Sequence, residues 1–273
     1  MLIKFFTACL LFSTLFFNKL QSQELIVIES DYLKGNDSVL VFTPKGYNPL
    51  GSCHTPALFL LHGWSGAYSD WHRKADIQKF SDKYGFIIIT PDGFYNSWYL
   101  NNIDKEKMQW RSFFDNELYP LIIKRYNLNS ANTFITGLSM GGHGAINIFI
   151  DDPSRFKAAG SMSGVLNLHD SNSRLKENQI SEVLGPYNNT NHHFDDESAI
   201  NRLELLKGSK GSNKMLIISC GTQDYLAKSS YDFSEECNRL DIPNTLIISP
   251  GVHSWDYWIF ALDLHLFLFT KLL

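Results

Sequence analysis

Gly137-Leu138-Ser139-Met140-Gly141-Gly142 is the stretch that decides how this chain folds. The β-type run TFIT (133–136) precedes it, and the helix-compatible run HGAINIFI (143–150) follows it. A strand, a tight turn and a helix in this order are the context of a G-x-S-x-G nucleophile elbow. The turn strains the serine backbone, and the small glycines let the strand and helix approach closely. We predict that Ser139 is a nucleophile; an ordinary glycine-rich loop is the alternative.

Outside this stretch, short apolar runs alternate with amphipathic segments. Runs that are apolar on both faces are typical of parallel strands covered by helices on both sides. The expected strands are 25–29, 39–43, 57–61, 86–90, 133–136, 157–162, 215–219 and 245–249, and the expected helices are 70–80, 110–126, 140–150, 197–206, 229–240 and 255–269. This alternation predicts an α/β fold with a doubly wound, mostly parallel sheet and helices on both faces.

Two segments break the alternation. Residues 94–109 are polar and aromatic, and residues 165–196 are rich in Asn, Ser, His and Asp. Each follows a strand, and open α/β sheets bind ligands at the carboxyl ends of their strands. We expect both segments to be loops over a site, so that residues 23–273 form a single domain.

A serine hydroxyl is a weak nucleophile and needs a base. Asp224 and His253 occupy matching places, each just beyond one of the last two predicted strands (215–219 and 245–249). Ser, then Asp, then His is the chain order of α/β-hydrolases. We predict that His253 takes the proton from Ser139, while Asp224 holds the imidazole tautomer and stabilises the imidazolium.

Other acids and histidines fit this role less well. Asp92 precedes the elbow and is out of chain order, and Asp256 begins a predicted helix, where an acid is expected for dipole reasons alone. His143 lies on the helix after the elbow, where we expect it to pack or cap.

The oxyanion of an acyl-transfer reaction needs two hydrogen-bond donors. One expected donor is the backbone N–H of Met140, directly after the nucleophile. The second is expected from the early strand-to-helix loop LHGWSG (61–66), where glycines let the backbone approach a substrate oxygen. We assign it to the N–H of Trp64.

The motifs of this chain, taken together and in order, resemble those of a known family. The segments LLHGWSG, PDG followed by SWY, GLSMGGHGA, CGTQDYL and GVHSWDYW stand in the order of the "Putative esterase" family, over about Val39 to the C-terminus. That family includes esterase D, the antigen 85 mycolyltransferases, and the acetyl xylan and feruloyl esterases of carbohydrate esterase family 1. The resemblance implies the α/β-hydrolase fold, the triad Ser139, Asp224 and His253, the oxyanion-hole amides of Trp64 and Met140, and no cofactor.

Aromatic residues gather near the expected site. We expect Trp98, Tyr99, Trp255 and the loop residue His62 to border the substrate. Aromatic rings at such places could stack on a sugar or feruloyl ring. Packing inside a lid is the alternative for Trp98 and Tyr99.

Residues 1–22 are typical of a secretory signal peptide. Lys4 supplies the positive start, an apolar run to residue 17 follows, and a polar exit leads to cleavage near Gln23. The apolar run is too short to span a membrane comfortably, so we expect export without stable membrane insertion; an uncleaved anchor is the alternative.

Charge excludes some classes of partner. Cleavage removes Lys4 and Lys19 and no acid, so the formal net charge moves from −4 to −6. A mildly acidic chain without a Lys/Arg run is a poor binder of nucleic acid.

A metal site and a disulfide receive little support. No C-x-x-C pair is present, and His192-His193 with Asp195-Asp196 is interpreted as a solvated loop rather than a metal site. Of the three cysteines beyond residue 22, Cys220 and Cys237 are either two buried thiols or a disulfide pair. We expect no metal.

The sequence therefore predicts a secreted serine ester hydrolase acting on simple short-chain esters or on acetyl or feruloyl esters of polysaccharide. The alternatives are an acyltransferase with the same triad, a thioesterase like S-formylglutathione hydrolase, and a non-catalytic binding protein. The acyl group, the leaving group and the oligomeric state are left open.

Overall fold

The computed structural model describes residues 23–49, 54–169, 177–188 and 190–273, and the predicted signal peptide lies outside this part. Eight strands form one sheet in the order β1-β2-β4-β3-β5-β6-β7-β8. Their bounds are β1 Gln23–Ser30, β2 Gly35–Phe42, β3 Ala57–Leu61, β4 Ile87–Pro91, β5 Thr133–Gly137, β6 Ala158–Met162, β7 Leu216–Gly221 and β8 Asn244–Ser249. Each neighbouring pair of strands from β4 to β8 in this order is parallel. At the other edge, β2 pairs antiparallel with both β1 and β4. The doubly wound, mostly parallel sheet that the sequence predicted is confirmed.

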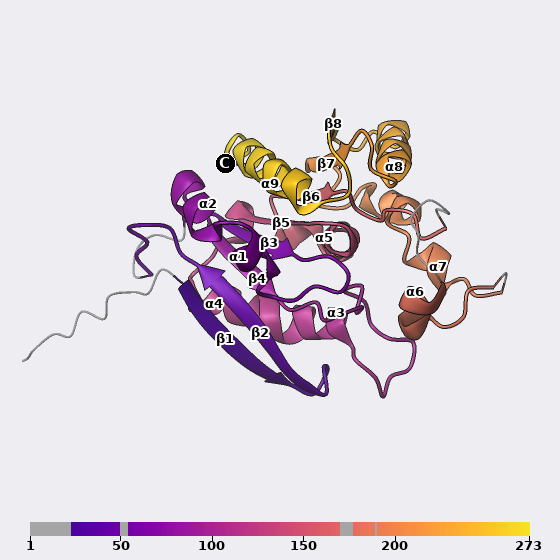
Figure 1. Ribbon diagram of the computed structural model, residues 1–273, viewed down its shortest axis with the longest axis horizontal. Helices are drawn as coiled ribbons and strands as arrows, with labels where there is room; N and C mark the ends of the chain where they lie inside the picture. The colour runs from indigo at the N-terminus through magenta and orange to yellow at the C-terminus, as the bar shows by residue number, and fades with distance from the viewer. Residues whose placement is uncertain (1–22, 50–53, 170–176, 189) are drawn as a thin grey trace, which may run out of the picture.

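Helices cover both faces of the sheet (Figure 1). The main helices are α1 Asp70–Lys74, α2 Ile77–Tyr84, α3 Trp110–Phe113, α4 Tyr119–Arg125, α5 Met140–Asp151, α8 Ala227–Arg239 and α9 Trp255–Thr270. Side chains alternate along β3: Phe59 and Leu61 join one apolar core with α3, α4, α5 and α8, whereas Leu58 and Leu60 join the other with α1, α2 and α9. β3, β4 and β5 are buried along their whole length, and β3 is apolar throughout, as expected of parallel strands covered on both faces.

Several expected helices differ from the prediction. The helix predicted over 70–80 is split into α1 and α2, because Asp76 begins a new helix and its carboxylate accepts the N–H of Lys79. The 110–126 segment contains a π-helical stretch, η1 (Phe114–Leu118), between α3 and α4. The 199–206 segment (η5, Ala199–Leu206) is 3₁₀ rather than α-helical.

The prediction that 165–196 is a loop is wrong in part. It contains α6 (Glu177–Leu184) and the short α7 (His193–Asp196), although residues 170–176 and 189 lie outside the described part. Ile180, Val183 and Leu184 of α6 are buried. Their spacing is helical, but the polar residues around them obscured it.

Among the described residues, no helix has both the length and the hydropathy that a membrane span requires.

Candidate active site

Ser139 lies between the end of β5 and the start of α5. Its backbone has φ +51° and ψ −115°, a conformation that non-glycine residues rarely adopt. The Ser139 N–H donates to the carbonyl of Met162 at the end of β6 (2.9 Å), which holds the strained residue in place. This is the strand–turn–helix geometry that the sequence predicted for the elbow.

Glycine is required beside the serine for a steric reason. A Cβ on Gly141 would lie 2.5 Å from the carbonyl oxygen of His62, a distance that real Cβ atoms essentially never show. Gly141 therefore lets α5 pack directly against the end of β3, and this contact brings Ser139 close to the loop that follows β3.

Three side chains from three strand ends form one hydrogen-bonded chain. His253 Nε2 lies 3.1 Å from Ser139 Oγ, and His253 Nδ1 lies 2.9 and 3.1 Å from the two carboxylate oxygens of Asp224. The carboxylate accepts only, so Nδ1 carries the proton and Nε2 is left to accept from the Ser139 hydroxyl. The Asp224 side chain is fully buried and that of His253 is 16% exposed, so the histidine meets the solvent side.

Hydrogen bonds keep Asp224 ionised despite its burial. Burial acts to raise the pKa of this carboxyl, but hydrogen bonds from His253, the Leu226 N–H and the Ser163 hydroxyl outweigh it, so the pKa lies below its ordinary value. Sequence reasoning missed Ser163. The signal available was only its place directly after β6, at the same edge of the sheet.

Aromatic rings hold the imidazole of His253 on two sides. Its ring centroid lies 4.6 Å from that of Tyr225 and 4.9 Å from that of Trp258, the latter ring being perpendicular to it. Trp258 belongs to α9, one turn after Ser254. This packing restricts the ring to the orientation that reaches both Ser139 and Asp224.

Two backbone N–H groups near Ser139 have no acceptor in the described protein. Met140 is the first residue of α5, so its N–H lacks an intrahelical partner. In the loop after β3, Ser65 donates to the Tyr95 carbonyl (2.7 Å) and Gly66 to the Gly63 carbonyl (3.1 Å), but Trp64 makes no backbone hydrogen bond among the described residues. Both predicted oxyanion donors are therefore available.

A cavity of about 530 Å³ opens beside the serine, within the size range of small-molecule sites. Its lining residues are Gly63, Trp64, Ser65, Gly66, Asp70, Trp98, Leu138, Ser139, Val165, Tyr225, His253, Ser254, Trp255 and Trp258. Trp98 and Trp255, both predicted to border the substrate, are among them, although only 1% of Trp98 is exposed.

His62 and Tyr99 were predicted to border the substrate, but neither is among the residues that line this cavity. Both are buried, at 1% and 0% exposure. The Tyr99 hydroxyl donates to the His62 carbonyl (2.9 Å). His62 Nε2 accepts the Gly93 N–H (2.7 Å), so Nδ1 carries the proton and donates to the Gly63 carbonyl (2.8 Å). Both side chains therefore pack against the loop that contains Trp64 and join this loop to the 94–109 segment, to which Tyr99 belongs.

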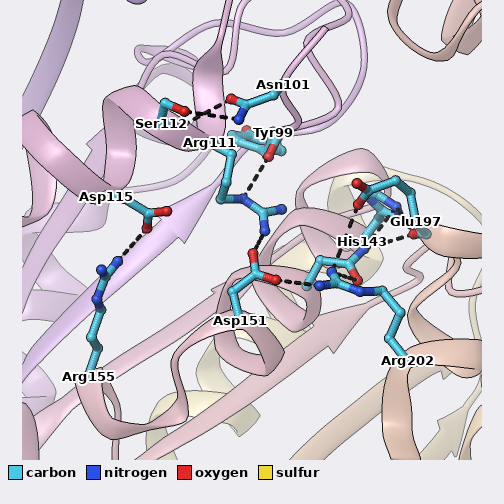
Figure 2. A network of polar contacts seen from close by, with 11 residues as sticks. Tyr99, Asn101, Arg111, Ser112, Asp115, His143, Asp151, Arg155, Glu197 and Arg202 are labelled. Atoms are coloured by element: carbon cyan, nitrogen blue, oxygen red, sulfur yellow. Dashed lines mark hydrogen bonds and ion pairs between the residues drawn. The ribbon is translucent and has the colours of Figure 1, made fainter. Parts of the chain in front are cut away.

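Trp98 and Tyr99 are held in a strained backbone. Their φ angles are +55° and +59°, in the left-handed region that bulky residues rarely adopt. Buried Arg111 donates through Nε to the Tyr99 carbonyl (3.1 Å) and pairs with Asp151 at the end of α5 (Figure 2). Asp151 also pairs with Arg202 of η5. This network ties the wall that contains Trp98 to the elbow helix.

The remaining candidates lie elsewhere. Asp92 lies 3.4 Å from His62 Nε2, and Asp256 is exposed in the first turn of α9. His143 is buried and lies 2.9 Å through Nε2 from the Glu197 carbonyl oxygen. Cys220 and Cys237 are buried free thiols rather than a disulfide pair. Among the described residues no cluster of His, Cys, Asp and Glu could hold a metal ion.

Comparison with known proteins agrees with this geometry. The model of the family described as "Putative esterase" matches residues 30–267. The chain belongs to this family. The protein is thus an esterase, as its sequence predicted.

Named relatives include both hydrolases and acyltransferases. The chain is 29% identical over 250 residues to an acetyl esterase of Caldicellulosiruptor saccharolyticus, covering 84% of this chain and 91% of that protein. It is 24% identical over 247 residues to the diacylglycerol acyltransferase/mycolyltransferase Ag85A of Mycobacterium tuberculosis, covering 76% and 71% of the two chains.

Solved structures confirm the α/β-hydrolase fold. A ferulic acid esterase superposes with a TM-score of 0.77 at 22% identity, covering 92% of this chain and 99% of that one. The serine hydrolase FphF of Staphylococcus aureus gives 0.79 at 22% identity, covering 90% and 97%. An S-formylglutathione hydrolase of Agrobacterium tumefaciens gives 0.76 at 21% identity, covering 91% and 94%.

Proposed function

We propose that this esterase is a serine hydrolase that cleaves carboxylic esters through an acyl-enzyme on Ser139. The observation that carries the proposal is the hydrogen-bonded chain from Ser139 Oγ through His253 to Asp224, with distances of 3.1 and 2.9 Å. Such a chain turns a weak hydroxyl nucleophile into an effective one.

The first half of the reaction forms the acyl-enzyme. Ser139 Oγ attacks the ester carbonyl carbon while His253 Nε2 takes the hydroxyl proton, and Asp224 stabilises the imidazolium. The N–H groups of Trp64 and Met140 donate to the developing oxyanion. The C–O bond to the alcohol then breaks, and His253 gives its proton to the departing oxygen.

The second half returns the enzyme to its starting state. Water attacks the acyl carbon and transfers a proton to His253. The Ser139–acyl bond then breaks, the carboxylic acid leaves, and the proton returns to Ser139 Oγ. The reaction consumes one water and needs no redox partner.

Ser139→Ala tests this mechanism. We expect kcat for p-nitrophenyl acetate to fall by about 10⁴- to 10⁶-fold, since the nucleophile and its base act as a unit. Circular dichroism and the melting temperature should show a folded protein. A variant that keeps a tenth of the activity would exclude Ser139 as the nucleophile.

For the substrate we propose acetyl or feruloyl esters of polysaccharide, or simple short-chain esters. An acetyl esterase among the relatives and a ferulic acid esterase among the similar structures support this choice, as does the cavity rich in aromatic residues. Initial rates on acetylated xylan, methyl ferulate and p-nitrophenyl esters of rising acyl length would rank these substrates.

An acyltransferase is the second candidate, because Ag85A is among the relatives. The same acyl-enzyme would pass its acyl group to an alcohol instead of water. Product analysis by mass spectrometry, with glucose or trehalose present as acceptor, distinguishes free acid from acylated sugar. A thioesterase like S-formylglutathione hydrolase shares the fold, and release of glutathione from its formyl thioester is the corresponding assay.

We also propose that the protein is exported after cleavage near Gln23, from the pattern of residues 1–22. Expression of the full-length chain followed by Edman sequencing of the extracytoplasmic fraction should give a start near Gln23. Extracytoplasmic protein that still begins at Met1 would contradict cleavage.

A further inference from the structure

Asp70 is a carboxylate in the cavity to which the mechanism assigns no role. It is the first residue of α1, it lines the same cavity as Ser139, and its side chain is 18% exposed. The nearest cationic group is the Arg73 guanidinium, 3.8 Å away on a side chain that is 63% exposed. Among the described residues no donor hydrogen-bonds to the Asp70 carboxylate. Its oxygens are therefore available to a ligand.

Asp70 is the only acidic residue in the described lining of this cavity. The same lining contains no lysine or arginine. The other lining side chains are mainly aromatic, and Ser65 and Ser254 add neutral hydroxyls. An apolar cavity with a few polar groups orients its ligand through those groups. In this cavity the dominant polar group is a negative hydrogen-bond acceptor.

We propose that Asp70 determines which alcohol the esterase accepts: it binds the hydroxyl groups of an uncharged, sugar-like alcohol and rejects esters that carry negative charge. This inference rests on ester hydrolysis at Ser139 and names its substrate class. An ionised carboxylate accepts strong hydrogen bonds from hydroxyls and repels another anion nearby. A glutathione thioester carries two carboxylates and is therefore a poor fit.

The aromatic wall favours a hydroxylated ligand over a cationic one. A cation binds above an open ring face. Here the rings pair edge to face: Trp255 with Trp71 at 83°, Trp258 with Trp255 at 83°, and His253 with Trp258 at 90°. In such pairs the edge of one ring covers the face of another, which leaves less open face for a cation.

Two matched pairs of esters test the inference on the wild-type enzyme. Methyl 3-O-acetyl-β-xylopyranoside has two free ring hydroxyls that cyclohexyl acetate lacks, and methyl 4-acetoxybenzoate is the neutral methyl ester of the anion 4-acetoxybenzoate. We expect kcat/KM to favour the first member of each pair by roughly tenfold or more, the size typical of hydrogen bonds to charged groups. The preference within the charged pair should shrink as salt rises.

Variants assign these preferences to Asp70. Asp70→Asn keeps an acceptor oxygen but removes the charge, so the preference for methyl 4-acetoxybenzoate should fall to about threefold or less. Asp70→Leu removes the acceptor, so the preference for the xyloside should disappear. Asp256→Asn is the matched control, because Asp256 is also in the first turn of a helix but does not line this cavity; it should leave both ratios unchanged.

The outcomes separate this inference from the proposed function. Wild-type ratios near one, or ratios that Asp70→Asn and Asp70→Leu leave unchanged while hydrolysis continues, would overturn the role of Asp70 alone. A preference for acetylcholine over the xyloside that Asp70→Asn abolishes would overturn the hydroxylated alcohol in favour of a cation. Hydrolysis of p-nitrophenyl acetate that survives Ser139→Ala would overturn the proposed mechanism itself.

Discussion

At the scale of single residues, two serines with positive φ lie at the ends of neighbouring strands. Ser139 has φ +51° and Ser163 has φ +49°, and each such residue costs about 1–3 kcal/mol. Each is held by a hydrogen bond from its own N–H to the next strand in the sheet, Ser139 to Met162 and Ser163 to Ser219 (2.9 and 2.7 Å). In this backbone conformation the Ser139 hydroxyl lies beside His253 and the Ser163 hydroxyl lies beside Asp224.

Ser163→Ala should reduce activity without removing any group that reacts. Asp224 would lose one donor, so fewer groups would hold its carboxylate in the orientation that fixes His253. We expect kcat/KM to fall by roughly three- to tenfold, the net size of one typical intramolecular hydrogen bond.

Ser163→Gly is the matched control, because glycine also lacks the hydroxyl but tolerates positive φ. Equal losses in the two variants would assign the effect to the hydroxyl. A loss in the alanine variant alone would assign it to the backbone and contradict the prediction.

At the scale of elements, the loops after successive strands are tied to one another. The N–H of Leu138 donates to Leu61 of β3, that of Ser139 to Met162 of β6, and that of Thr222 to Ser249 of β8, at 3.2, 2.9 and 2.9 Å. Each hydrogen bond fixes the position at which one loop leaves the sheet relative to the neighbouring strand. This is why residues as distant in sequence as Ser139 and His253 meet.

The 94–109 segment depends on a different attachment, the ion pair of Arg111 with Asp151 (Figure 2). Arg111→Met should lower stability and loosen the strained Trp98–Tyr99 wall. The loss should be at the lower end of the about 3–5 kcal/mol that breaking a buried pair costs, because Asp151 is partly exposed and keeps Arg202. We expect KM for bulky aryl esters to rise several-fold, with a smaller change for p-nitrophenyl acetate.

The Asp115–Arg155 pair, in the same view but without contact to that wall, is the control (Figure 2). Both side chains are partly exposed, so Asp115→Asn should lower stability by about 1 kcal/mol or less and leave KM unchanged. Equal changes of KM in the two variants would show that the Arg111 pair has no special part in positioning the wall.

At the scale of the whole molecule, two fully buried histidines are neutral. Burial lowers the pKa of His143 and of His265 to about 3. His265 lies between the hydroxyls of Thr136 (3.0 Å) and Ser219 (2.9 Å), so that it joins α9 to β5 and β7. The unfolded chain takes up these protons near the ordinary histidine pKa of about 6.5, whereas the folded chain does not.

Stability should therefore fall as pH drops from about 6.5 towards 3, by about 1.4 kcal/mol per pH unit for each histidine. Urea unfolding between pH 4 and 7 measures this slope. His265→Gln retains donors and acceptors for both hydroxyls but does not titrate, so the slope should decrease by about that amount. The exposed His193→Gln should leave it unchanged, and an unchanged slope in His265→Gln would refute the explanation.

Much of the architecture and of the candidate site could be predicted from the sequence, because the signals are local. A run that is apolar on both faces marks a parallel strand wherever it lies, and parallel strands end at a common edge. Ser139, Asp224 and His253 each follow such a run, so their meeting required only the order of the strands. The glycines around Ser139 likewise reflect a steric need within a few residues.

What only the tertiary structure decided depends on contacts between distant segments. Tyr99 is buried because its hydroxyl reaches the His62 carbonyl and its ring packs against Trp110 (4.6 Å), although its neighbour Trp98 reaches the cavity. Asp70 and Ser163 resemble ordinary helix-start and loop residues in sequence, and only the packed structure places Asp70 in the cavity that Ser139 lines and Ser163 near Asp224. The periodicity of a strand specifies where the chain leaves the sheet. The burial of side chains in the following loop depends on which other loops pack against it, and no local sequence pattern encodes that packing.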